Sequence, residues 1–167
     1  IRQNTKNHLN IACLAVNPVS EECYVSFFTK ALYVFTQNSQ TLSSLFNHQS
    51  AITAVSVTGD GKQILVGDIS GGLSIWDRQK KNLLFSQNRH NSPVVKLAVS
   101  TDDHWALTGC ENSKLTIWDL EKRVSIETID LKSSGNMIES LCFSANQQSI
   151  YVGLSNGVIL EFELRLP

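Results

Sequence analysis

Short apolar runs separated by turn residues recur along the whole chain. The stretch 64–77 reads ILVGDISGGLSIWD: an apolar, partly β-branched run, a glycine-rich middle, and a second apolar run that ends in Ile-Trp-Asp. Glycines in that density supply the positive φ angles that a tight hairpin turn requires. The stretch 106–119, ALTGCENSKLTIWD, has the same length and the same apolar positions. Each stretch therefore predicts two antiparallel strands joined by a turn.

Two sets of landmarks indicate that this unit occurs four times. The aromatic residues that close the second apolar run recur at intervals of 41, 42 and 44 residues, as Phe35, Trp76, Trp118 and Phe162. A set of apolar residues recurs at the same intervals, as Leu14, Val55, Leu97 and Leu141. A chance apolar pattern would lose this register within one unit, so we predict four repeats.

Each unit is predicted to hold four short strands, except the fourth unit, which ends after three and lacks its own outer strand. The units span approximately residues 8–46, 47–87, 88–131 and 132–166, within one domain of residues 1–167. No segment shows a 3.6-residue period over ten or more residues. The chain is therefore predicted to be all-β.

Composition and charge narrow the choice of partners. The chain has 42% hydrophobic residues, enough to bury a core, and a net charge of −1. So small a charge implies no field that would hold a phosphate backbone or an anionic membrane. No apolar stretch approaches the ~18 residues that would cross a bilayer, and no signal peptide is recognisable. We expect neither a nucleic-acid partner nor a membrane.

The four cysteines argue against a metal site. Cys13, Cys23, Cys110 and Cys142 lie far apart and form no C-x-x-C pair, so neither a zinc site nor a disulfide framework is indicated. Buried free thiols in a reducing compartment are the simpler interpretation. The chain also has no N-x-S/T glycosylation sequon. We expect an intracellular protein, cytoplasmic or nuclear.

Signs of catalysis are absent from the sequence. There is no nucleophile elbow, no phosphate-binding glycine loop and no H-E-x-x-H pair. Adjacent acids such as Asp102 and Asp103 fall at a predicted turn, where carboxylates ordinarily face solvent. His104 beside them is interpreted as a surface residue. We predict no enzyme, no catalytic residue and no cofactor.

The repeats resemble the WD-repeat (WD40) β-propeller family. The similarity rests on the ~40–45-residue period, on His48 and His90 near the start of the second and third units, and on the Ile-Trp-Asp endings at Asp77 and Asp119. It implies four blades around an axis, as a segment of a larger, typically seven-bladed ring. The first and fourth units lack Trp-Asp and depart from the family pattern.

The resemblance leaves two arrangements open for the start of the chain. In the favoured one, residues 1–7 are the outer strand of an adjoining, upstream blade. In the other, residues 1–5 supply the missing strand of the fourth unit and close an unusually small ring. An open arc would leave an unpaired strand edge at each end, and such an edge invites pairing with another chain.

In this family a network of His, a hydroxyl residue, Asp and Trp ties the loop entering a blade to its third strand. The resemblance implies a structural role here for His48, Asp68, Trp76, His90, Asn112 and Trp118. The Asp of the family's tight turn is Ser70 in the second unit and Asn112 in the third. Asp68, close by, is a candidate substitute. The network is therefore expected to be weaker, and the outer units to depend on apolar packing.

The resemblance also implies that one face of the propeller carries the partner-binding residues. The candidates are the strand-linking tips Phe28, Ile69, Glu111 and Ser155, and the loop residues Arg89 and Glu139 that precede first strands. The apolar tips either dock a partner or pack within the blade. The predicted function is a non-catalytic scaffold that docks partner proteins or other domains of its own chain, further blades included. The alternative is the regulatory or sensing propeller of a larger enzyme, such as an ATPase or kinase.

Overall fold

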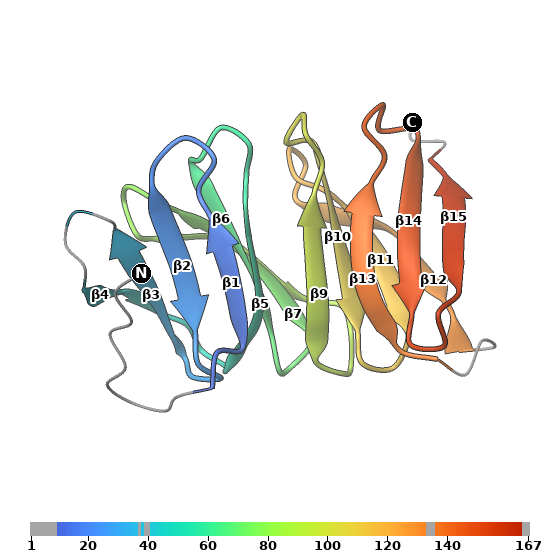
Figure 1. The fold of residues 1–167 in the computed structure, drawn as a ribbon, viewed down its shortest axis with the longest axis horizontal. Coiled ribbons are helices and arrows are strands. Elements are labelled where there is room, and N and C mark those ends of the chain that lie inside the picture. The colour runs from blue at the N-terminus through green and yellow to red at the C-terminus, as the bar shows by residue number, and fades with distance from the viewer. Residues whose placement is uncertain (1–9, 37, 39–40, 133–135, 165–167) are drawn as a thin grey trace.

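The computed structural model describes residues 10–36, 38, 41–132 and 136–164. Within these residues the chain forms four antiparallel sheets and no α-helix, which confirms the all-β prediction (Figure 1). The first sheet holds β1 (Cys13–Val16), β2 (Glu22–Ser26), β3 (Ala31–Thr36) and β4 (Leu42–Asn47). The second holds β5 (Ile52–Val57), β6 (Gln63–Asp68), β7 (Gly72–Asp77) and β8 (Leu83–Asn88).

The third sheet holds β9 (Val94–Val99), β10 (Trp105–Cys110), β11 (Lys114–Asp119) and β12 (Val124–Asp130). The fourth holds β13 (Ile138–Phe143), β14 (Ser149–Leu154) and β15 (Ile159–Glu163). As predicted, this last sheet has three strands among the described residues. The two proposals for residues 1–7 fall on residues 1–9, which lie outside the described part of the chain.

The two central hairpins have the same register. Trp76 pairs with Ile64 across β6 and β7, and Trp118 pairs with Ala106 across β10 and β11. The two tryptophans therefore occupy the same place in their sheets, as the repeat predicts. Because successive side chains point to opposite faces of a strand, this register also places the apolar residues of both hairpins on equivalent faces.

The sheets stand in a row with their first strands side by side. β1 contacts β5, β5 contacts β9, and β9 contacts β13. Figure 1 shows the first and fourth sheets at opposite ends of this row. The described strands therefore form an arc, and the faces of neighbouring sheets enclose the core.

Three apolar clusters fill the spaces between neighbouring sheets. Between the first and second sheets, Tyr24 and Leu32 pack against Ile64, and the ring of Phe46 stacks on Trp76 with centroids 4.0 Å apart. Between the second and third, Leu65 packs with the cluster around Trp118. Between the third and fourth, Leu107 and Ile117 pack against Ile150 and Val152. Each fully buried Leu or Ile contributes about 1.5–3 kcal/mol to folding, so every sheet is stabilised through its neighbours.

A glycine allows neighbouring sheets to approach closely. A Cβ added at Gly67 of β6 would lie 2.5 Å from Val94 Cγ1 of β9, and one added at Gly109 of β10 would lie 3.0 Å from Ile138 of β13. The first strand of the next sheet therefore packs directly on each glycine. This explains why glycine occurs three residues before the tight turn in both central repeats.

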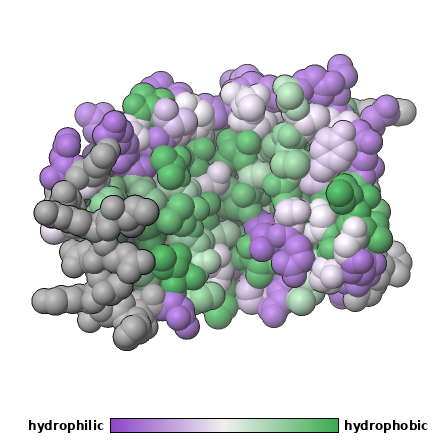
Figure 2. Space-filling view, in the orientation of Figure 1, coloured by the Kyte–Doolittle hydropathy of each residue, from purple (hydrophilic) through white to green (hydrophobic). Residues whose placement is uncertain are grey.

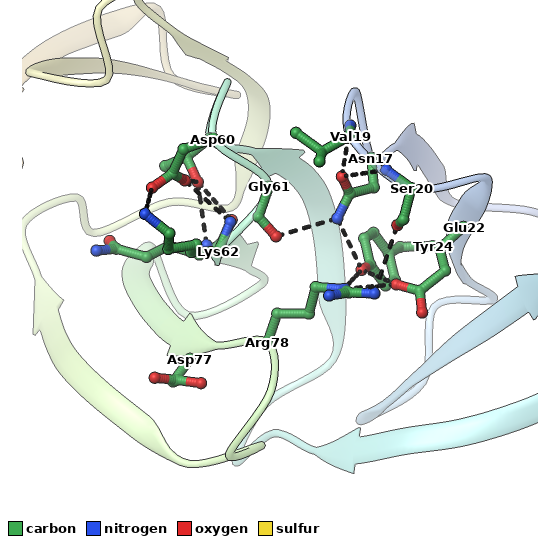
Figure 3. Close-up of polar contacts among 12 residues, drawn as sticks. Asn17, Val19, Ser20, Glu22, Tyr24, Asp60, Gly61, Lys62, Asp77 and Arg78 are labelled. Atoms are coloured by element: carbon green, nitrogen blue, oxygen red, sulfur yellow. Dashed lines mark hydrogen bonds and ion pairs between the residues drawn. The ribbon is translucent and has the colours of Figure 1, made fainter.

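Polar contacts between turns add to the apolar packing at one edge of the arc. Asn17 Nδ2 donates to the Gly61 carbonyl at 3.1 Å, and Asp60 N donates to Asp103 Oδ2 at 2.9 Å. Figure 3 shows Arg78, the residue after β7, reaching Glu22 of β2: its Nε lies 2.6 Å from Glu22 Oε2. The hydrogen bond from Arg78 lowers the pKa of the Glu22 carboxyl.

Arg78 also donates to the hydroxyl of Tyr24 at 3.0 Å, and that hydroxyl donates to Glu22 Oε2 at 2.6 Å. One guanidinium thus holds two side chains of β2 against the second sheet (Figure 3). Leu120 occupies the equivalent position 42 residues later and is buried in the apolar cluster between the second and third sheets. The chain therefore uses a polar tie at one sheet boundary and an apolar contact at the next.

Candidate protein-binding surface

A hollow of about 370 Å³ lies where three neighbouring sheets meet, at the edge of the arc that carries the turns after β2, β6 and β10. It is lined by Ala12, Phe28, Thr53, Ile69, Pro93, Val95 and Glu111. Three of the six predicted partner-binding residues, Phe28, Ile69 and Glu111, are thus brought together. Figure 2 shows hydrophobic residues gathered across the face formed by β1, β5 and β9, on which the hollow opens.

The lining residues come from equivalent positions of the repeat. Phe28, Ile69 and Glu111 follow the second strand of their sheets at intervals of 41 and 42 residues, and Ala12, Thr53 and Val95 have the same intervals at the first strands. No single repeat can build this hollow, because each contributes one tip and one residue in or next to its first strand, and Pro93 before β9 completes the lining. Sequence analysis found the tips but missed the first-strand positions. The signal was present, since Glu139 is the fourth member of that column, 44 residues after Val95.

Phe28 is held in an unusual conformation. Its φ angle is 57°, in the left-handed region, and its side chain remains 58% exposed. In the next two turns the left-handed residues are Gly71 and Ser113, two positions after the tip. A left-handed conformation costs a residue with a side chain roughly 1–2 kcal/mol. Folding therefore gains little from this phenylalanine, neither from burial nor from backbone geometry.

The other predicted binding residues lie away from the hollow. Arg89 is exposed between β8 and β9, and the Ser155 hydroxyl accepts a hydrogen bond from Met137 N at 3.1 Å. Glu139 was predicted in the loop before a first strand, but it is the second residue of β13. The strand begins earlier because Ile138 is already paired with Leu154. The Oε2 atom of Glu139 lies 3.8 Å from the Nζ atom of Lys96, which is in β9.

The structural network implied by the family is built differently in the two central sheets. In the third, Thr108 Oγ1 lies 2.8 Å from His90 Nε2 and accepts a hydrogen bond from Trp118 Nε1 at 2.8 Å. One buried hydroxyl therefore joins the entry loop to the third strand. Asn112, at the position of the family's turn Asp, donates to Asn91 and not to the histidine.

In the second sheet the network contains the carboxylate and lacks the hydroxyl. Asp68 Oδ2 lies 2.8 Å from His48 Nε2, and Asp68 Oδ1 accepts from Ser70 N at 2.8 Å and Gly72 N at 3.1 Å. The position equivalent to Thr108 is Val66, and the buried Trp76 Nε1 has no partner among the described residues.

Electrostatics distinguish the two histidine environments. Burial opposes ionisation of Asp68, but hydrogen bonds from His48, Ser70 and the Gly72 amide lower the pKa of its carboxyl. Burial, with smaller effects from Lys114 and Arg89, lowers the pKa of His90 to about 4. His90 is therefore neutral at pH 7 and its ring serves as a packing and hydrogen-bonding group.

All four cysteines are free, but they are not uniformly buried as predicted. Cys110 is buried, whereas Cys142 is exposed on a face of the fourth sheet that no other described sheet covers. Burial raises the pKa of Cys13 to about 12, which makes its thiolate scarce at neutral pH. Among the described residues, no three His, Cys, Asp or Glu side chains come together as metal ligands. The same residues contain no long apolar helix of the kind that crosses a bilayer.

Comparisons with known proteins agree with the repeat and the fold. Residues 39–77 and 81–119 match the model of the WD domain, G-beta repeat. The chain is similar to the crystal structure of the computationally designed Ika4 protein, with a TM-score of 0.78 over 95% of this chain and 94% of that one. The two are 18% identical, so this likeness concerns the fold alone. No curated protein matches the chain.

The first matched segment contains β4 to β7 and the second contains β8 to β11, so each repeat joins the outer strand of one sheet to the first three strands of the next and ends at the Trp-Asp of β7 or β11. The flanking sheets follow the same plan of consecutive antiparallel strands. Residues 39–77 and 81–119 are therefore WD40 repeats of a β-propeller, and the flanking described strands continue the same antiparallel plan.

Proposed function

We propose that this chain is a non-catalytic scaffold that docks a partner protein, or another domain of its own polypeptide, through the hollow formed by Phe28, Ile69 and Glu111. WD40 repeats generally form protein-interaction domains. The observation that carries the proposal is the exposure of two large apolar side chains in that hollow, 58% for Phe28 and 53% for Ile69. Apolar and aromatic side chains of this kind form the centres of protein interfaces.

A second contact is proposed on the outer face of the first blade. Leu14, Val16 and Phe35 are 55%, 60% and 37% exposed there. Val55 and Trp76, the equivalents of Leu14 and Phe35, are buried in the cluster shared with the first blade. A further blade with an apolar face would cover the first blade in the same way. The free thiols and small net charge support an intracellular setting, without nucleic acid or membrane.

The test is affinity capture with the full chain and two double variants. F28S/I69S removes the exposed apolar side chains of the hollow, and V19S/V124S removes two comparably exposed side chains elsewhere, 71% and 43% exposed. We expect the first variant to lose partner proteins that the wild type and the second variant both retain. Equal retention by all three chains, with unchanged circular dichroism, would contradict the proposal.

A further inference from the structure

The walls of the hollow are apolar. Five of its seven lining residues have side chains without a polar group: Ala12, Phe28, Ile69, Pro93 and Val95. A volume of about 370 Å³ is near the lower end of the ~300–1,000 Å³ typical of ligand pockets. The hollow therefore has room for one or two side chains of a peptide segment and cannot enclose a folded domain.

Two lining residues are polar, and only one has a group left for a partner. Thr53 Oγ1 donates to the Val94 carbonyl at 2.5 Å, so its proton is already used within the fold. Glu111 is exposed and forms no ion pair within the described part of the chain; only its backbone N–H is engaged, with the Pro93 carbonyl at 2.9 Å. The single charge at the hollow is thus negative, and its carboxylate can only accept hydrogen bonds.

Burial of an apolar side chain would strengthen the effect of this charge. A side chain placed between Phe28 and Ile69 displaces water beside Glu111, and a charge pair is stronger where water is excluded. An acidic group in the same place would meet like charge with no cation lining the hollow. Charge complementarity therefore selects a cationic ligand.

We propose that the occupant is a peptide segment that inserts an apolar side chain between Phe28 and Ile69 and places an adjacent arginine or lysine on the Glu111 carboxylate. This inference rests on the proposed scaffold function and specifies the chemistry of the partner. Arginine fits better than lysine, because its planar guanidinium can bind a carboxylate through two hydrogen bonds. The conformation of Phe28 agrees with this role: the left-handed backbone holds the ring at the hollow, where folding does not require it.

The experiment selects random heptapeptides displayed on phage against the full chain, and titrates the enriched peptides into the ¹⁵N-labelled chain. We expect enrichment of arginine or lysine next to an apolar residue, with amide shifts at Phe28, Ile69 and Glu111. E111Q should weaken the selected peptides about three- to ten-fold, as expected for a partly exposed charge pair. E111K should favour acidic peptides. The matched control E21Q removes an exposed carboxylate outside the hollow and should change affinity by less than about two-fold.

The outcomes separate this inference from the proposed function. Failure to enrich any peptide, enrichment of acidic or uncharged peptides, or equal affinity of wild type and E111Q would overturn the cationic ligand. Partner capture that still depends on Phe28 and Ile69 would in that case leave the scaffold function standing. If F28S/I69S, with an unchanged amide spectrum elsewhere, binds the peptides as tightly as the wild type, the hollow is not the site.

Discussion

The two central blades use different side chains to bind the histidine of the loop that enters each blade. In the third blade the hydroxyl of Thr108 joins a histidine to a tryptophan. In the second blade Val66 occupies the equivalent position, and Asp68 binds the histidine instead. The indole of Trp76 consequently has no acceptor in the described structure. Apolar packing on Phe46 holds this ring in place without the hydrogen bond.

Exchanging the two equivalent residues tests this division. T108V leaves the buried Trp118 N–H without its acceptor, and we expect it to lower the free energy of unfolding by about 1–3 kcal/mol. V66T introduces a hydroxyl near the unpaired Trp76 N–H, so its cost should stay below about 1 kcal/mol. Urea denaturation followed by tryptophan fluorescence measures both. A larger loss for V66T than for T108V would contradict the assignment.

At the scale of the strands, the contact between a glycine and the next blade's first strand sets the spacing of the arc. Gly67 and Gly109 both receive an apolar side chain of that strand. Gly153 is their equivalent in the fourth blade, but an added Cβ there would meet only Ser140 within its own sheet. The same position is thus constrained inside the arc and relaxed at its end.

Alanine at these positions should therefore have unequal effects. G67A places a methyl group 2.5 Å from Val94 Cγ1, in a contact where neither strand can withdraw, and should cost about 1–3 kcal/mol. G153A meets a serine hydroxyl that can rotate away, so we expect a change below about 1 kcal/mol. Differential scanning calorimetry of the two variants compares them. Equal destabilisation would show that the fourth blade is constrained in the same way as the second.

At the scale of the whole molecule, stability should be concentrated in the middle of the arc. Among the described residues, the extensive contacts between blades join sequence neighbours, so the central blades are supported on two sides and the outer ones on one. Burial of the third strands follows this order: β7 and β11 of the central blades are almost entirely buried, whereas β3 and β15 of the end blades are mostly half-buried or exposed.

Hydrogen–deuterium exchange should reproduce this gradient. We expect backbone amides of β7 and β11 to exchange at least about 100-fold more slowly than those of β3 and β15, the equivalent strands of the end blades. Amides of β14, which lie in the interior of an end blade, should fall between the two groups. Uniform protection in all four blades would mean that the arc unfolds only as a whole, and would contradict the nearest-neighbour description.

The repeat register of the sequence predicts some residues of the hollow but not all of them. Phe28, Ile69 and Glu111 could be predicted because they occupy one column of the repeat. The first-strand residues Thr53 and Val95 share a column with Glu139 that is visible in the sequence, but whether this column faces a hollow depends on how neighbouring sheets are set against each other.

The sequence by itself determined the all-β class, the four repeats and the strands of each, because alternation of apolar residues and turn chemistry act over a few residues and repeat in register. Only the tertiary structure decided which equivalent positions are covered. Ala98 packs against the fourth blade, whereas Cys142, its equivalent 44 residues later, is exposed. The physical reason is that burial of a blade face depends on the neighbouring sheet, which a residue's own sequence context does not encode.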